Sequence, residues 1–107
     1  MHKVVRHTEG KIRKISDTKS SNNLITKEIS PTVSLATIEA SDYNEKEITD
    51  YDRIYYLLEG ALELFIENET VELQPGDVCY LSSGTEYEMK GTFRAIVVNQ
   101  PAFGSWL

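Results

Sequence analysis

The sequence predicts an all-β protein with a single domain folded as a small β-barrel or jelly roll. Along residues 61–67 the side chains alternate, with Leu62 and Leu64 on one face and Glu63 on the other, which is typical of a half-buried strand. Further short apolar segments follow, separated by turn-like residues and by the glycines at positions 60, 76 and 84. Glycine is favoured where strands turn tightly or backbones approach closely. The central stretch, residues 50–87, therefore indicates short antiparallel strands, and no helix of normal length is expected.

The composition limits the classes of protein to which the chain can belong. Its 107 residues suffice for one hydrophobic core, and 40% hydrophobic and 26% charged residues are ordinary for a globular domain. A formal net charge of −6 argues against nucleic-acid and anionic-membrane partners, since both need clustered Lys and Arg. One cysteine excludes an internal disulfide framework, and no apolar run approaches the length of a membrane span. We therefore expect a cytoplasmic protein.

The first 30 residues are expected to form an N-terminal segment, and residues 31–107 the barrel. The segment carries most of the basic side chains, at positions 3, 6, 11, 13, 14 and 19. It is interpreted as a strand added to the sheet of its own chain or swapped into that of a partner; the alternative is a basic arm for an acidic partner. Residues 20–23 are predicted to form a polar loop, and residues 24–29 a short strand that ends before Pro31.

In the barrel, residues 33–40 are rich in β-branched side chains and predict a strand, whereas the charged residues 41–47 predict a surface loop. Beyond the central stretch, two short strands are expected at 86–90 and 93–99, separated by Gly91. The chain ends in an unusually apolar tail, residues 103–107, which contains Trp106. Aromatic side chains often lie at the centres of interfaces. We therefore expect a homodimer in which the tail or the N-terminal segment covers part of the partner.

Several of these residues carry a family resemblance. The Leu-Leu-Glu-Gly of residues 57–60, the Pro-Gly-Asp of 75–77 and Gly84 resemble the two-motif core of the cupin superfamily, whose RmlC-like fold is a small β-barrel or jelly roll. Within that superfamily, residues 51–60 and 99–103 are most similar to the EutQ-type cupin domain of ethanolamine utilisation. The resemblance covers residues 31–107. It implies a cupin barrel and a link to a bacterial pathway whose enzymes are packaged in microcompartments.

The same resemblance locates the positions at which metal-dependent cupins hold their ion. Counted from Gly60, the position of the glutamate ligand is Arg53, and the first two histidine positions are Glu47 and Thr49, or Lys46 and Ile48 with the longer spacing. Counted from Gly84, the last histidine position is Tyr87. None of the four positions carries its family residue. Because transition metals need three or four imidazole, thiolate or carboxylate ligands, we expect no metal and no other cofactor.

A polar and aromatic barrel interior is expected instead. With a period of two along the strand, residues 47–55 place alternate side chains on one face. The pocket candidates are Glu47, Thr49, Tyr51, Arg53, Tyr55 and Tyr87. Arg53 suits a small anion, because its guanidinium binds carboxylates or phosphates in a planar fork. Alternatively, Arg53 pairs with Glu47 or Glu86 inside a barrel that is filled by its own side chains.

Two classes of function follow from the residues and the resemblance. The first is a metal-free cupin domain that binds a small, anionic molecule or serves as an accessory protein in ethanolamine utilisation. The second is an enzyme, either of the acetate kinase type credited to EutQ-like proteins or a metal-dependent cupin enzyme. The sequence contains no nucleotide-binding glycine motif. We therefore favour binding over catalysis.

Overall fold

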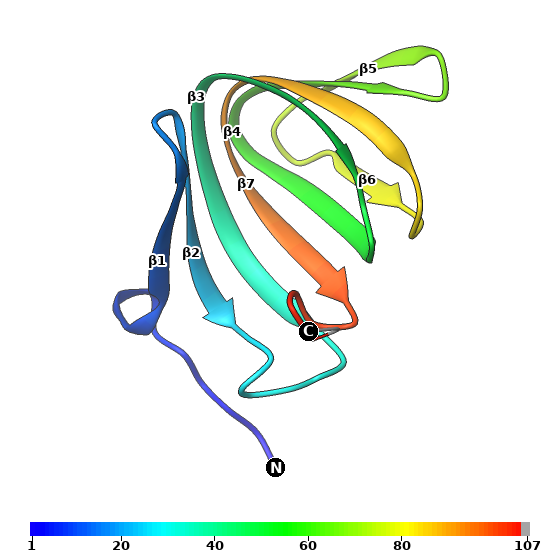
Figure 1. Cartoon of the computed structure of the whole chain (residues 1–107). Helices are drawn as coiled ribbons and strands as arrows, with labels where there is room; N and C mark the ends of the chain where they lie inside the picture. Colours follow the sequence, from blue (N-terminus) through cyan, green and yellow to red (C-terminus); the bar gives the residue numbers. More distant parts are fainter. Residues whose placement is uncertain (106–107) are drawn as a thin grey trace.

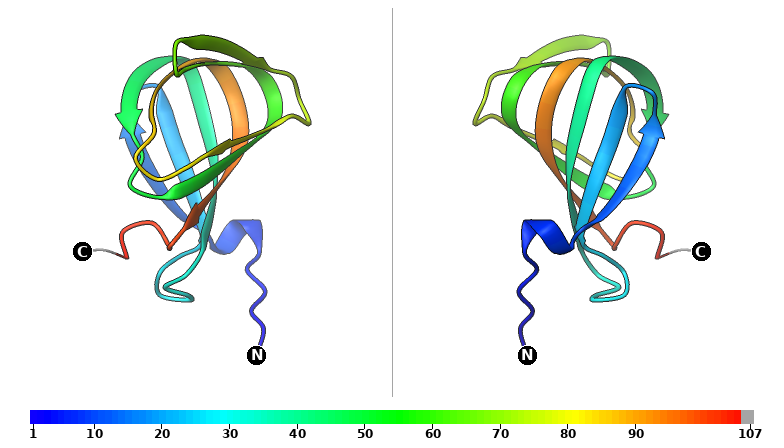
Figure 2. Two further views of the ribbon diagram at one scale, coloured as in Figure 1. Left: turned by 90° about the vertical axis from the view of Figure 1, so that its right-hand side faces the viewer. Right: turned by 90° about the vertical axis from the view of Figure 1, so that its left-hand side faces the viewer.

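The computed structural model describes residues 1–105, and the prediction of a single all-β domain is confirmed (Figure 1). All strand pairs are antiparallel, in the sheet order β1-β2-β3-β7-β4-β5, with β6 paired to β4. The views in Figure 2 show the sheet rolled into a barrel. The elements are the 3₁₀ turn η1 (His7–Glu9), β1 (Lys11–Ser16), β2 (Lys19–Ile25), β3 (Ser34–Ile48), β4 (Asp52–Ile66), β5 (Glu69–Leu73), β6 (Val78–Leu81) and β7 (Glu86–Gln100).

Three predictions about individual elements are wrong, and the strand expected at residues 24–29 is correct only as far as Ile25, because residues 27–29 form a turn. Residues 41–47 are the second half of β3 and not a loop, residues 86–100 form one strand and not two, and residues 20–23 lie inside β2. In each case local composition suggested solvent or a break. However, β3 and β7 pair with each other along most of their length, so that Glu45 lies opposite Met89. Pairing of this kind overrides local β-propensity.

The three long strands bend sharply near their middles, which allows one sheet to close on itself. The register of β3 against β7 shifts between Ala40 and Tyr43, and that of β4 against β7 shifts between Leu57 and Glu59. Such bulges bend a strand and increase its local twist. Gly60 and Gly91 lie beside these shifts, and both have positive φ angles, +86° and +143°.

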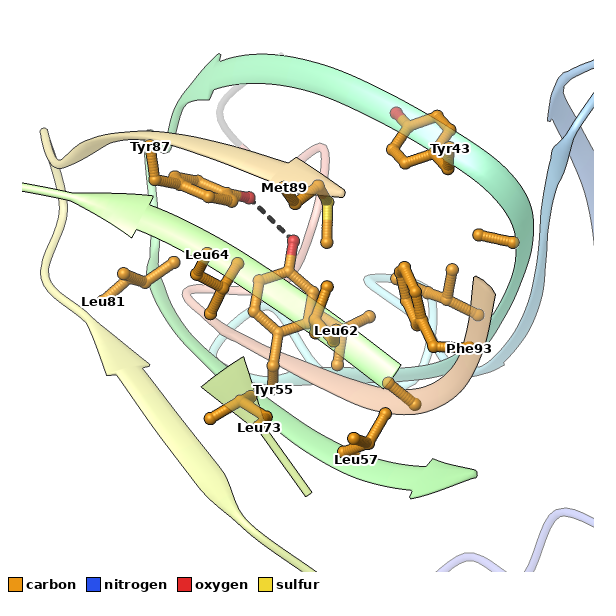
Figure 3. Packing of buried hydrophobic residues seen from close by; sticks show 14 of the residues in the cluster. Tyr43, Tyr55, Leu57, Leu62, Leu64, Leu73, Leu81, Tyr87, Met89 and Phe93 are labelled. Atoms are coloured by element: carbon orange, nitrogen blue, oxygen red, sulfur yellow. Dashed lines mark hydrogen bonds between the residues drawn. The ribbon is translucent and has the colours of Figure 1, made fainter. Parts of the chain in front are cut away.

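The buried hydrophobic side chains pack together inside the barrel (Figure 3). Leu62 and Leu64 are fully buried, as the alternation predicted, while Glu63 stands on the outer face. Leu57, Met89 and Phe93 complete the centre of this core. Among the described residues, no helix is long and apolar enough to cross a membrane.

The end of the chain packs against the start of β3 and against Tyr51, which precedes β4. The Phe103 backbone N–H donates to Ser34 Oγ at 2.9 Å, and the Gly104 N–H donates to the Tyr51 hydroxyl at 2.8 Å. The rings of Phe103 and Tyr51 lie 5.5 Å apart. The predicted interface role of Trp106 lies outside the described residues, and the homodimer stays a prediction.

Candidate functional site

Next to the largest core side chains, the inner face of the sheet carries small and polar side chains. The register places Ser34 beside Asn99 and Asn99 beside Arg53, so that three strands contribute one polar row. The next row of the same face contains Ala36 beside Val97. Because alanine and serine are short, these positions leave space that larger side chains would fill.

That space is a cavity of about 470 Å³. Its wall includes the polar row, side chains of β1 and β2, and Phe103 from the tail. Five cationic side chains (Lys11, Arg13, Lys19, Lys27 and Arg53) line it against three carboxylates (Glu28, Glu45 and Glu47), an excess of two positive charges. The whole chain has a net charge of −6. Positive charge is therefore concentrated at this cavity, which favours anions there.

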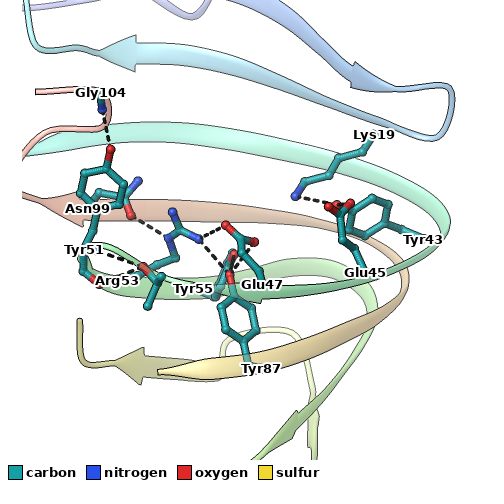
Figure 4. Close-up of polar contacts among 11 residues, drawn as sticks. Lys19, Tyr43, Glu45, Glu47, Tyr51, Arg53, Tyr55, Tyr87, Asn99 and Gly104 are labelled. Atoms are coloured by element: carbon teal, nitrogen blue, oxygen red, sulfur yellow. Dashed lines mark hydrogen bonds and ion pairs between the residues drawn. The ribbon is translucent and has the colours of Figure 1, made fainter. Parts of the chain in front are cut away.

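Arg53 is the centre of the polar row, and only 5% of it is exposed. Its Nη1 donates to Glu47 Oε1 at 2.8 Å and to the Tyr87 hydroxyl at 2.9 Å, while its Nε donates to Asn99 Oδ1 at 2.7 Å (Figure 4). Of the two predicted partners, Glu47 is therefore the one that pairs with Arg53. The cationic plane also lies near the Tyr51 ring, with Cζ 5.8 Å from the ring centre.

The hydroxyls of Tyr87 and Tyr55 extend this network. Tyr87 accepts from Arg53 and donates its proton to Glu47 Oε2 at 3.0 Å. A phenol has only one proton to donate, so Tyr55 must be the donor in its 2.7 Å hydrogen bond with Tyr87. The hydrogen bonds thus all point in one direction, from the Tyr55 hydroxyl through the Tyr87 hydroxyl to the Glu47 carboxylate.

The environment fixes the charge states of this network. Burial alone would raise the pKa of Glu47, but the hydrogen bond and charge of Arg53 and the Tyr87 hydroxyl outweigh it and hold that pKa below its ordinary value. Burial raises the pKa of Tyr87, and the adjacent Tyr55 adds to the effect. At neutral pH, therefore, Glu47 is an anion and Tyr87 keeps its proton.

Part of the Arg53 guanidinium remains without a partner. Within residues 1–105, Arg53 Nη2 makes no hydrogen bond, and neither does the Nδ2 amide nitrogen of Asn99. Figure 4 shows Nη2 on the side of the guanidinium away from Tyr87. Both residues line the cavity. Neither nitrogen is a fully buried atom, so both donors reach the open space of the cavity. A largely buried cation with donors that face a cavity is a ready position for an anion.

A second polar cluster lies on another part of the wall. Lys19 is 8% exposed, and its Nζ donates to the Tyr43 hydroxyl at 3.4 Å and lies 4.6 Å from the centre of that ring. The Tyr43 hydroxyl in turn donates to Glu45. Burial lowers the pKa of Lys19, although Glu47 and Glu45 oppose the shift. This cluster adds a cation to the cavity and balances it with a carboxylate.

The structure brings together five of the six predicted pocket residues, of which Glu47, Arg53 and Tyr55 line the cavity. Glu47, Arg53, Tyr55 and Tyr87 form one hydrogen-bonded network, and Tyr51 packs beside it. Thr49 is different: its hydroxyl donates to the Tyr51 carbonyl and accepts from the Tyr51 N–H. Thr49 therefore shapes the turn between β3 and β4 and makes no hydrogen bond to the network.

Sequence reasoning missed two important members of the site. Asn99 had a usable signal, because its inward position follows from the alternation of the strand that was expected at 93–99. Lys19 had none, since it lies among basic residues that suggested a solvated arm. In addition, within the part of the chain that the structure describes, no three His, Cys, Asp or Glu side chains form a group suited to a metal ion.

We expect the contribution of Glu47 to stability to depend on pH. Its pKa is lower in the folded protein than its ordinary value of 4.5. Stability of this kind is present above the unfolded pKa and is lost as the pH falls through the folded pKa. Urea unfolding of the wild type and of Glu47→Gln between about pH 7 and pH 3 should therefore show a constant difference near neutrality that shrinks below about pH 4.5. An unchanged difference at pH 3 would contradict this assignment.

Comparison with known proteins shows the family and the fold to which the chain is similar. The sequence profile of the family described as ethanolamine utilisation protein EutQ matches residues 1–106. No curated protein sequence matches the chain. The solved structure of the Clostridium difficile EutQ protein is 25% identical, with 84% of this chain and 67% of that chain covered and a TM-score of 0.75.

Two further structures show the same fold. A protein from Salmonella typhimurium, described as ethanolamine utilisation protein Q, is 22% identical, with 92% of this chain and 85% of that chain covered and a TM-score of 0.80. An RmlC-like cupin from Shewanella frigidimarina is 12% identical, with 100% and 97% covered and a TM-score of 0.84. The profile thus spans nearly the whole chain, and the fold is that of the RmlC-like cupins. The chain belongs to the EutQ family of ethanolamine utilisation proteins, within the cupin superfamily.

Proposed function

We propose that this domain is a metal-free cupin that binds a small anionic molecule in its barrel, and that it serves ethanolamine utilisation as a binding or accessory protein. The observation that carries the proposal is the buried guanidinium of Arg53, whose Nη2 has no hydrogen bond within residues 1–105 while the residue lines a cavity of about 470 Å³. The anion accepts hydrogen bonds from Arg53 Nη2 and Asn99 Nδ2.

Free energy favours a ligand-binding role for Arg53 over a role in which its side chain only fills the barrel. Burying an arginine costs free energy unless its charge is paired and its donors are used. Glu47 pairs the charge, and Nη1 and Nε are used. An arginine that only filled the barrel would need no further hydrogen-bond donor and no cavity beside it. The excess of cationic side chains around the cavity supports the same conclusion, since it attracts an anion to the mouth.

The same residues support binding without a metal. Arg53 occupies the position at which the related metal-dependent cupins carry a carboxylate ligand, and a guanidinium repels a metal cation. Tyr87 is also poorly suited to transfer protons. The raised pKa of Tyr87 keeps it far from the operating pH, whereas a general acid or base works best with a pKa near that pH. In this domain the tyrosines orient Glu47 and Arg53.

The binding experiment compares the wild type with variants of Arg53. Isothermal titration at fixed ionic strength would use a panel of small and larger carboxylates and inorganic phosphate. A charge-assisted hydrogen bond contributes about 1.5–3 kcal/mol, so Arg53→Ala should weaken the best anion by roughly ten- to a hundredfold. Arg53→Lys should recover only part, because an ammonium lacks the planar fork.

Two controls separate binding from folding. Arg94→Ala removes a half-exposed guanidinium that pairs with Glu59 at 2.9 Å on the surface, and it should leave the affinity unchanged. The double variant Arg53→Met with Glu47→Gln removes both charges, so that no unpaired charge is left in the interior. If no anion binds to the wild type while Arg53→Ala melts several degrees lower, Arg53 is a structural residue and the proposed function is wrong.

A further inference from the structure

The size of the cavity sets a lower limit on its ligand. Sites for small organic molecules typically span about 300–1,000 Å³ and bury most of the ligand. The cavity of about 470 Å³ lies inside that range. Acetate or inorganic phosphate at Arg53 would occupy one corner and leave most of the apolar wall uncovered. Because burying apolar surface is favourable, a ligand that fits this cavity has an apolar part as well as a charged group.

The distribution of side chains indicates which part of the ligand goes where. The free donors of Arg53 and Asn99 lie in the polar row that also contains Ser34. Along the strands from this row, the inner face continues with Ala36 and Val97 and then with Ile38. Ile15 and the ring of Tyr43 line the cavity as well. Beyond the polar row the wall thus carries an apolar strip, bordered by Ser21 and Asn23 of β2 and by the Lys19–Tyr43–Glu45 cluster. Such a strip suits an amphipathic ligand that binds with its charged group at Arg53.

The charges of the interior favour a single negative charge on that ligand. Inside the barrel, the carboxylates of Glu47 and Glu45 already balance Arg53 and Lys19. A second negative charge on the same group of the ligand, next to Arg53, would lie near the Glu47 carboxylate, which repels it. The two unused donors, Arg53 Nη2 and Asn99 Nδ2, match the two oxygens of a carboxylate. A phosphate dianion has three oxygens to satisfy and needs more donors.

We propose that the ligand is a monocarboxylate with an elongated apolar body, its carboxylate held by Arg53 and Asn99 and its body lying on Ala36, Val97 and Ile38. This inference rests on the proposed function, since it concerns the same anion site. It further specifies that affinity depends on the body of the ligand as well as on its charge.

A series of straight-chain acids tests the inference on the intact protein. Acetate, butyrate, hexanoate and octanoate are titrated by calorimetry below their aggregation limits, with octan-1-ol as the uncharged counterpart of octanoate. Each added CH₂ should increase the affinity by about three- to fourfold until the cavity is full. Octan-1-ol should bind at least tenfold more weakly than octanoate.

Cavity variants locate the body of the ligand. Ala36→Leu places a larger side chain on the cavity floor and should reduce the affinity for octanoate at least tenfold while leaving acetate unchanged. Thr37→Leu, at the next position of β3 and facing outward, is the matched control and should change neither. If Ala36→Leu does not fold, Ser21→Val fills the same cavity from β2 and makes the same prediction.

The outcomes distinguish a failure of the proposed anion binding from a failure of the proposed ligand class. If neither the carboxylates nor phosphate bind to the wild type, the proposed function fails and the inference fails with it. If short acids bind but the affinity does not change from acetate to octanoate, the proposed anion binding stands. The proposal that the ligand has an apolar body is then refuted. If octan-1-ol binds as tightly as octanoate, or if phosphate binds more tightly than every carboxylate, the monocarboxylate assignment is refuted.

Discussion

Glu47→Ala is expected to destabilise the protein by about 3 kcal/mol, because it leaves the buried guanidinium of Arg53 without its counter-ion. Removing one partner of a buried ion pair costs about 3–5 kcal/mol. The Glu47 side chain is still 35% exposed, so the lower end of that range applies. For a domain of 107 residues, this corresponds to a fall in melting temperature of about 10 °C or more. Thermal unfolding followed by circular dichroism measures it directly.

Replacing Arg53, the other partner of the ion pair, should destabilise the protein less than replacing Glu47. Arg53→Met leaves Glu47 unpaired, but a carboxylate with partial exposure can be hydrated or take up a proton, whereas an arginine cannot lose one in the physiological range. The expected order of stability is therefore wild type, then Arg53→Met, then Glu47→Ala. Glu39→Ala, which removes an exposed carboxylate from the same strand, should change the melting temperature by no more than a degree or two. Equal melting temperatures for Glu47→Ala and Glu39→Ala would contradict this account of the pair.

Much of the fold could be predicted because its signals are local. The alternation of Leu62, Glu63 and Leu64 identifies a half-buried strand from three neighbours in sequence, and burial confirms it. The shared inward face of Tyr51, Arg53 and Tyr55 follows from the same period of two, and all three side chains are buried. Such patterns need no knowledge of which strands become neighbours in the sheet.

The parts that could not be predicted depend on contacts between distant residues. The charges of residues 41–47 suggest a loop, yet β7 supplies the partner that makes them a strand. Arg53 meets Asn99 across 46 residues of sequence, and Lys19 reaches the barrel through the pairing of β2 with β3. The choice of Glu47 over Glu86 as the partner of Arg53 is likewise set by which face of the bent strands each side chain occupies.

Gly91→Ala is expected to prevent stable folding, with a loss of more than about 4 kcal/mol. Gly91 lies at the bend of β7, opposite Tyr43 on one side and Leu62 on the other. A Cβ atom there would lie 2.1 Å from the Ala61 carbonyl oxygen, a contact with backbone that no side-chain rotation relieves. The φ angle of +143° adds strain for any residue with a side chain. Soluble yield and far-ultraviolet circular dichroism report the outcome.

Gly76→Ala separates the two causes in this prediction. Gly76 also has a positive φ, +95°, but an added Cβ would meet nothing within 4 Å. Its substitution therefore incurs only the conformational cost, about 1–2 kcal/mol, and the protein should fold with a lower melting temperature. Gly60→Ala should resemble Gly91→Ala, since its Cβ would lie 2.2 Å from the Thr92 carbonyl oxygen. If all three variants lose the same stability, backbone strain alone accounts for the glycines, and the close approach of β4 to β7 at the bend is not what requires them.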